Sequence, residues 1–170
     1  MNQRPPNRRV KSRYNLSSMS TSIRAARPED ARDIADVFLA ARATMTYLPK
    51  LHGDEETRAF FSQVVMELEV IVAERNERVV GFAALRGPWL DHLYVHPSRF
   101  DSGTGSKLFA EVKKRRTDGF QFWVFQQNAG ARRFYERLGC ALARLTDGSG
   151  NEERVPDALY VWPVTRAPTE

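Results

Sequence analysis

Hydrophobic positions recur along the chain with two periods, and these periods predict both helices and strands. Apolar residues three and four positions apart predict helices that begin at Pro28 and that span about 54–66, 104–116 and 129–138. Short apolar runs bounded by turn residues predict strands, which are expected at 22–25, 70–74, 79–85, 89–95, 121–125, 141–145 and 158–162. The alternating order predicts an α/β fold with a mixed sheet and helices on both of its faces.

The apolar face of each helix is expected to pack on this sheet. The residues predicted to face the core are Ile34, Val37, Phe38 and Ala41 in the first helix, Phe60, Phe61, Val64 and Val65 in the second, and Leu108, Phe109 and Val112 in the third. Cys140 lies in the apolar run 138–142, so it is expected to be a buried strand residue and not a nucleophile.

Length and composition fit one cytoplasmic domain. A chain of 170 residues is long enough to bury a sizeable core. No apolar run approaches the roughly 18 residues that a membrane-spanning helix needs, so no membrane partner is expected. The single cysteine excludes an internal disulfide and suits a reducing compartment, which predicts a cytoplasmic location.

The net charge of +5 is concentrated at the N-terminus. Residues 1–20 contain five of the 26 basic residues and none of the 21 acidic ones, so the remainder carries 21 of each. A neutral domain offers no basic face, and a nucleic-acid partner is not expected. The tail 1–20 is rich in Pro, Asn and Ser and is expected to be disordered, with the folded domain at 21–165. Met19 offers an alternative start, and an anchoring role of the tail stays open.

A glycine-bearing loop after the strand 89–95 carries the first sign of chemistry. Gly103 and Gly105 let the main chain approach a ligand closely, and a helix that begins near Thr104 leaves its first N–H groups without partners. These donors and the helix dipole favour an anion such as a diphosphate. Spacing excludes a P-loop, which needs Lys directly after Gly105, and a dinucleotide loop, which needs glycine where Leu108 stands. A strand-to-helix turn without a ligand stays the alternative.

The second sign is the helix at 129–138. Asn128 suits its N-cap position, and Tyr135 follows two turns later. A phenol with a pKa of about 10 is able to act as a proton donor. From the residues alone, a half-buried aromatic side chain is the simpler explanation of Tyr135.

At these two segments the chain resembles the GNAT superfamily of N-acetyltransferases, which transfer an acetyl group from acetyl-coenzyme A to an amine. The residues that match the family's strand end, phosphate loop and later helix are Val95, Pro97, Gly103, Gly105, Asn128, Ala131, Phe134, Tyr135 and Gly139. The departures are Phe100, in place of a polar or basic residue, and Cys140, in place of Phe. The resemblance covers 22–163 and implies the GNAT fold, a mostly antiparallel sheet of six to seven strands that is splayed in its middle.

The resemblance also implies roles for individual residues. The residues implied to bind acetyl-coenzyme A are Leu93, Val95, Asp101, Ser102, Gly103, Thr104, Gly105, Ser106, Asn128, Ala131 and Tyr135. Leu93 and Val95 would act through the main chain, with one N–H serving the thioester oxygen, and 101–106 would hold the diphosphate. Asn128 would bond the pantetheine arm, and Tyr135 would protonate the leaving thiolate. No metal is implied.

Two positions leave the chemistry open. Because Phe100 is apolar, positive charge would come from Arg99 or Lys107, unless these are solvated surface residues. His92, on the strand 89–95, has an intrinsic pKa that suits a general base. A solvated strand position explains His92 equally well, and an amine of low pKa needs only a path to water.

Acceptor specificity is expected to lie in the first two helices and a late loop. Residues 45–53 are rich in aromatic and apolar groups, and 146–157 carries four acids that would either attract a cationic amine or remain solvated. The implied acceptor is a primary amine on a small molecule or a protein, acetylated by direct transfer in a ternary complex. A non-catalytic acyl-coenzyme A sensor, a protein acetyltransferase anchored by its tail, and a homodimer stay open.

Overall fold

Residues 20–163, which the computed structural model describes, form alternating helices and strands. The helices are α1 (Ala31–Ala43), α2 (Asp54–Glu67), α3 (Thr104–Arg115) and α4 (Ala129–Arg137). The strands are β1 (Ser22–Ala25), β2 (Glu69–Arg75), β3 (Arg78–Arg86), β4 (Trp89–Val95), β5 (Phe120–Phe125), β6 (Ala141–Leu145) and β7 (Asp157–Trp162). Single turns of 3-10 helix, Pro28–Asp30 and Pro97–Arg99, precede α1 and α3.

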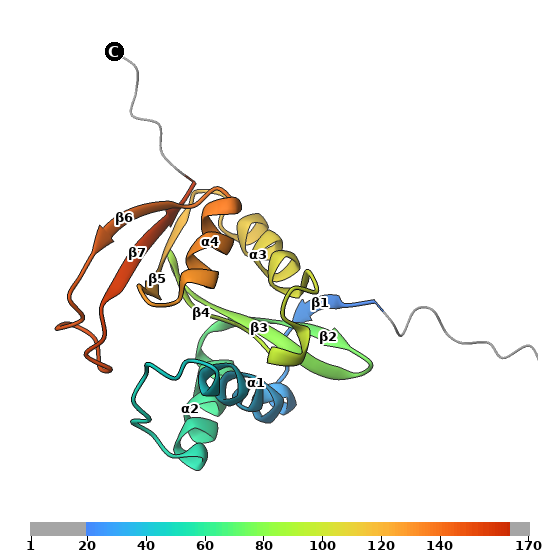
Figure 1. Cartoon of the computed structure of the whole chain (residues 1–170). Helices are drawn as coiled ribbons and strands as arrows, with labels where there is room; N and C mark the ends of the chain where they lie inside the picture. Colours follow the sequence, from blue (N-terminus) through green and yellow to red (C-terminus); the bar gives the residue numbers. More distant parts are fainter. Residues whose placement is uncertain (1–19, 164–170) are drawn as a thin grey trace, which may run out of the picture.

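The strands form one seven-stranded sheet in the order β1-β2-β3-β4-β5-β7-β6. All neighbouring strands are antiparallel except β4 and β5, which are parallel. Within the described residues β4 and β5 pair only at Trp89 and Gln121, and the two strands diverge beyond that point (Figure 1). The predicted mixed, mostly antiparallel sheet with splayed middle strands is confirmed.

Helices cover both faces of the sheet, as predicted. Helices α1 and α2 lie on one face, and α3 and α4 lie on the other (Figure 1). The core under α1 and α2 includes Ile34, Val37, Phe61, Val72 and Phe82, and the core under α3 and α4 includes Leu108, Phe109, Val112, Phe122 and Tyr160. The divergence of β4 and β5 therefore interrupts the middle of a sheet that is well packed on both sides. No helix within 20–163 has both the length and the apolarity to cross a bilayer.

An ion-pair network fixes the start of α1 against the sheet edge. The main-chain N–H of Arg27 donates to the Asp30 carboxylate at 2.7 Å, which caps the turn that begins at Pro28. The Arg24 guanidinium on β1 donates to Asp30 at 2.7 Å and to Glu74 on β2 at 2.6 Å. The hydrogen bonds from Arg24 hold the pKa of Asp30 below its usual range. The network thus joins β1, β2 and α1.

All the predicted helices and strands are present, and their ends lie within about two residues of the expected positions. The exception is the first helix, where a 3-10 turn occupies Pro28–Asp30 and α1 begins at Ala31. Two side-chain predictions need correction. Phe60 is 50% exposed, because α2 packs on the sheet through Phe61 and Val64 and turns Phe60 to its flank. Cys140 is buried as predicted but lies one residue before β6, and burial raises its pKa to about 11.

The predicted domain limits extend beyond the described residues. Residues 1–19 of the predicted tail lie outside them, as do 164 and 165 at the predicted end of the domain. The expected disorder and anchoring role of the tail therefore stay predictions.

Candidate active site

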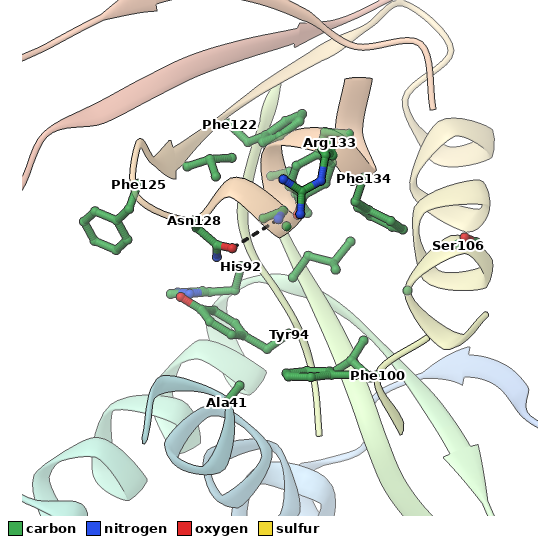
Figure 2. A pocket seen from close by; sticks show the side chains of 18 of the residues that line it. Ala41, His92, Tyr94, Phe100, Ser106, Phe122, Phe125, Asn128, Arg133 and Phe134 are labelled. Atoms are coloured by element: carbon green, nitrogen blue, oxygen red, sulfur yellow. Dashed lines mark hydrogen bonds between the residues drawn. The ribbon is translucent and has the colours of Figure 1, made fainter. Parts of the chain in front are cut away.

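A cavity of about 720 Å³ lies where β4 and β5 separate. Residues from β4, β5, α1, α4 and the start of α3 line it, and Figure 2 shows them, with His92 and Tyr94 on β4 and Arg133 and Phe134 on α4. Small-molecule sites in proteins typically enclose about 300–1,000 Å³. The cavity therefore has room for a ligand of cofactor size at the interruption of the sheet.

The main chain of β4 presents unpaired groups to this cavity. Just beyond the strand, the N–H of His96 donates to the carbonyl oxygen of Val80 at 2.8 Å, so this N–H faces β3. Because main-chain polar groups alternate sides along a strand, those of Leu93 and Val95 face β5 instead. No described strand pairs with β4 at Leu93 or Val95 from that side. Their donors and acceptors are therefore available to a ligand.

The loop between β4 and α3 forms an anion-binding turn. Asp101 (φ 59°) and Gly103 (φ 82°) are both left-handed, which turns the chain sharply ahead of α3. The N–H of Lys107 donates to the oxygen of Gly103 at 3.1 Å as the first bond of the helix. The N–H groups of 104–106 therefore have no partner within the helix and lie at the positive end of its dipole.

Three residues of this loop have roles that differ from one another. A Cβ on Gly105 would lie 3.3 Å from the ring of Phe134, so glycine lets α3 approach α4 here. Ser102 and Thr104 do not line the cavity, since the Ser102 hydroxyl donates to a loop carbonyl at 2.6 Å and the Thr104 side chain is buried. Any contact from these two would come from main-chain N–H groups.

Helix α4 reaches the cavity with its first two turns. Asn128 Oδ1 accepts a hydrogen bond from the N–H of Ala131 at 3.1 Å, which confirms the predicted N-cap and leaves the side-chain amide as a donor (Figure 2). Tyr135 also lines the cavity, with its ring 4.4 Å from that of Phe122 between centroids. Burial raises the pKa of Tyr135 above its usual range, and its hydroxyl has no hydrogen bond within residues 20–163. The phenol is therefore uncharged and able to donate.

Comparison with known proteins agrees with this geometry. Residues 67–139 match the family model of the acetyltransferase (GNAT) domain. This stretch runs from β2 to the end of α4 and contains the open strand edge, the anion-binding turn and the helix with Tyr135. Residues 67–139 are therefore assigned to a GNAT acetyltransferase domain.

Solved structures show the same GNAT fold. YjaB from Escherichia coli superposes with a TM-score of 0.70 at 22% identity, over 85% of this chain and 98% of that one. PaiA N-acetyltransferase from Thermoplasma acidophilum, solved with coenzyme A, gives 0.65 at 18% identity over 84% and 98%. YncA from Salmonella typhimurium, solved with its cofactor acetyl-CoA, gives 0.66 at 20% identity over 89% and 98%. No protein of curated function matches the chain by sequence.

The GNAT domain brings most of the predicted site residues to one cavity. These are His92, Leu93, Val95, Asp101, Gly103, Gly105, Ser106, Asn128, Ala131 and Tyr135. Their individual roles stay predictions. Within 20–163, no three or more His, Cys, Asp or Glu side chains are placed to hold a metal ion.

His92 lies half-buried among aromatic rings in the GNAT domain. The ring centroids of Phe61 and Phe60 are 5.3 and 6.0 Å from that of His92. Burial lowers the pKa of His92 to about 4, so the imidazole is uncharged at neutral pH. Taking a proton from an alkylammonium of pKa about 10.4 would be unfavourable by roughly a millionfold. This basicity does not suit the predicted general base, whereas an uncharged imidazole suits accepting a hydrogen bond from an amine.

Positive charge at the cavity of the GNAT domain comes partly from residues that the motifs did not single out. Arg99 lines the cavity, but Lys107 donates to a main-chain oxygen just before β1 at 3.2 Å and lies outside the lining. Arg133 and Arg137, one turn apart on α4, also line it and form no ion pair within 20–163. Figure 2 shows Arg133 pointing into the cavity, while Phe100 is half exposed at its edge. The signal for this pair in the sequence was the spacing of four residues between Arg133 and Arg137 on one predicted helix.

The acidic loop between β6 and β7 is held by specific bonds. The buried Asp157 carboxylate accepts hydrogen bonds from the Thr146 hydroxyl and from Asn151 Nδ2, the latter at 2.9 Å. Glu153 pairs with Arg42 of α1 at 2.7 Å. Solvation, one of the two explanations offered for the four acids, is therefore wrong for Asp157 and Glu153. The loop between β6 and β7 is therefore attached to α1 through the ion pair of Glu153 with Arg42.

Proposed function

We propose that the GNAT domain transfers an acetyl group from acetyl-coenzyme A to the nitrogen of a primary amine, by direct transfer in a ternary complex. The observation that carries the proposal is the unpaired edge of β4 at Leu93 and Val95, which opens into the cavity that the free N–H groups of 104–106 also adjoin. The similar structures PaiA and YncA, solved with coenzyme A and with acetyl-CoA, support this assignment of the cavity.

The residues present fit the coenzyme at three places. An extended chain with amide groups, such as the pantetheine arm, pairs with an open strand edge as an added strand, here at Leu93 and Val95. A diphosphate suits the N–H groups of 104–106 and the dipole of α3. Arg133 and Arg137 supply cations to phosphate oxygens without losing an existing partner.

The chain's own groups then serve the transfer. Acetyl-coenzyme A, when bound, supplies a thioester whose carbonyl carbon bonds to the amine nitrogen as the C–S bond breaks, leaving a thiolate that must gain a proton. A main-chain N–H of Leu93 or Val95 donates to the thioester oxygen, where negative charge develops. Tyr135 donates its hydroxyl hydrogen toward the leaving sulfur. His92 accepts a hydrogen bond from the amine, which releases its proton to water.

The cell compartment in this proposal is the cytoplasm. Cys140 is a free, buried thiol. A protein with one cysteine and no disulfide suits a reducing compartment. The acceptor is an amine that reaches the protein there.

A thiol-release screen tests the proposal. The full chain is incubated with acetyl-coenzyme A and a panel of alkyl, aromatic and polyamine amines, amino acids and peptides, and released coenzyme A thiol is measured. We expect release that depends on one class of amine, and a product heavier by one acetyl group in mass spectrometry. Coenzyme A binding is measured in parallel by calorimetry.

The two measurements separate the alternatives. Tight coenzyme binding with no amine-dependent thiol release would favour a non-catalytic acyl-coenzyme A sensor. No coenzyme binding would overturn the assignment of the cavity itself. Release with an acetylated oxygen or sulfur in the product would correct the acceptor atom.

A further inference from the structure

A second cavity of about 710 Å³ adjoins the first on the side of α1 and α2. The residues that line both cavities are Met45, Asp91, His92, Tyr94, Trp123 and Phe125. The shared wall includes the part of β4 next to Leu93, where the proposed transfer takes place. A molecule in the second cavity would therefore approach the proposed position of transfer from the side of α1 and α2.

Exposed aromatic side chains form much of the wall of this cavity. Phe60 on α2 is 50% exposed and Trp123 on β5 is 40% exposed, and both line it. Phe38 and Phe125 line it as well. Large apolar side chains left open within a concave surface mark a contact for an apolar ligand. The wall is therefore suited to an aromatic or other flat apolar body.

Two of the carboxylates that line the cavity are already paired. Asp91 accepts from Arg86 at 2.8 Å, and Glu153 accepts from Arg42 at 2.7 Å. The Arg42 guanidinium also lies over the ring of Phe125, 5.6 Å from its centroid. A ligand with several cationic nitrogens needs a free carboxylate for each, and these pairs leave neither Asp91 nor Glu153 free. The interior thus suits a ligand with one amine.

The rim of the cavity is net negative. His52 lies between two carboxylates, with Nδ1 2.8 Å from Glu56 and Nε2 2.7 Å from Glu152. Lys50 pairs with Asp54 nearby at 2.9 Å, which balances that acid. One imidazolium neutralises at most one of its two carboxylates, so an excess negative charge remains. Such a rim attracts an ammonium group to the entrance.

We infer that this cavity binds the acceptor as an arylalkylamine, a single primary amine on an aromatic body. The inference rests on the proposed function for the acetyl-transfer step, although binding of the amine is independent of it. The rim attracts the ammonium form, and the aromatic wall holds the ring. Inside, an apolar surrounding without a free carboxylate favours the uncharged amine, which is the nucleophile. His92 accepts its N–H hydrogen bond at the junction of the two cavities.

Calorimetry on the full chain saturated with coenzyme A tests the binding. The probes are 2-phenylethylamine, n-butylamine and spermidine, which compare an aromatic monoamine with an alkyl monoamine and a polyamine. We expect 2-phenylethylamine to bind at least about tenfold more tightly than the other two. Equal or tighter binding of spermidine or n-butylamine would overturn the inference.

Two variants locate the bound ring. Phe60→Ala should weaken 2-phenylethylamine binding by about tenfold and leave the dissociation constant of coenzyme A unchanged. Met66→Ala is the matched control, since Met66 is 80% exposed on the same helix and lines neither cavity. Trp123→Ala is a second variant on β5. If both aromatic variants bind 2-phenylethylamine as the wild type does, the ring does not lie in this cavity.

Thiol release then separates this inference from the proposed function. Acetylation of spermidine or a peptide but not of 2-phenylethylamine would overturn the acceptor class and keep the acetyltransferase. Tight binding of 2-phenylethylamine with no thiol release from acetyl-coenzyme A would keep the binding site and overturn the transfer.

Discussion

Replacement of Tyr135 by Phe removes one hydroxyl group and leaves the ring in its packing. The ring is 7% exposed, and its centroid lies 4.4 Å from that of Phe122 and 5.6 Å from that of Phe109. The hydroxyl has no hydrogen-bond partner within 20–163, so its removal leaves no other described group unpaired. The free energy of unfolding should therefore change by less than about 1 kcal/mol.

The expected loss of turnover follows from the relative acidities of the two groups. A thiol with a pKa of about 8.5 is a stronger acid than a phenol at about 10. Burial raises the pKa of Tyr135 further, so full proton transfer to the leaving thiolate is uphill. The hydroxyl then acts mainly by donating a hydrogen bond to the anion, which contributes about 1.5–3 kcal/mol. Tyr135→Phe should lower kcat by about 10- to 150-fold.

The assay combines three measurements on the full chain: kcat at saturating acetyl-coenzyme A, the dissociation constant of coenzyme A, and thermal unfolding. Tyr160→Phe is the control, because the Tyr160 hydroxyl is held by Arg132 at 3.0 Å and Glu136 at 2.7 Å and Tyr160 does not line the cavity. The control should lose about 1.5–3 kcal/mol of stability and keep its turnover. A Tyr135→Phe protein within twofold of wild-type kcat would refute the role of the hydroxyl as a hydrogen-bond donor to the leaving sulfur. A matching loss of coenzyme affinity would point to packing instead.

Three further changes test the cofactor cavity and the fold. Arg133→Ala should weaken coenzyme A binding by about five- to tenfold and reduce the salt dependence of that binding, whereas Lys107→Ala should change neither. Calorimetry at two salt concentrations measures both effects. Equal effects of the two variants would contradict the placement of Arg133 in the cavity and of Lys107 outside it. Gly148→Ala should lower the free energy of unfolding by at least about 2 kcal/mol, because the added Cβ would lie 2.3 Å from main chain across the loop and the residue has a φ of +82°. Gly150→Ala is the control, since a Cβ there would lie in open space, and it should cost less than about 1 kcal/mol. Equal denaturation midpoints for the two variants would contradict this prediction. Asp30→Asn should make the free energy of unfolding depend less steeply on pH in acid. The pKa of Asp30 is lowered in the folded protein, so its ionised carboxylate contributes fully to stability above the unfolded pKa of about 3.9. That contribution disappears as the pH falls through the folded pKa. Urea unfolding over about pH 2 to 6 checks this, and an unchanged acid slope would contradict it.

Local features were predictable from the sequence because they depend on neighbouring residues. The strand at Trp89–Val95 and the start of α3 at Thr104 appear where periodicity and glycine placed them. The N-cap at Asn128 likewise follows from its own side chain. Each of these features is decided within a few positions along the chain, so one sequence is enough to locate it.

Features that depend on packing between distant elements were not predictable in this way. Phe60 belongs to the same apolar arc as Phe61, and only the docking of α2 decides which of them is buried. Lys107 and Arg133 are equally basic in the sequence, but side-chain direction sends one to β1 and the other to the cavity. The pairing of Glu153 with a residue 111 positions away has no local signal.

Under the proposed function, the divergence of β4 and β5 would also make the amount of folded protein depend on the coenzyme concentration. A strand edge that pairs with the coenzyme in place of a neighbouring strand makes the coenzyme part of the sheet, so its binding adds directly to the free energy of unfolding. Under the proposed function, coenzyme at 100 times its dissociation constant adds about 2.7 kcal/mol. Domains of this kind have only about 5–15 kcal/mol in total. A fall in the coenzyme pool would then reduce the amount of folded enzyme as well as its rate.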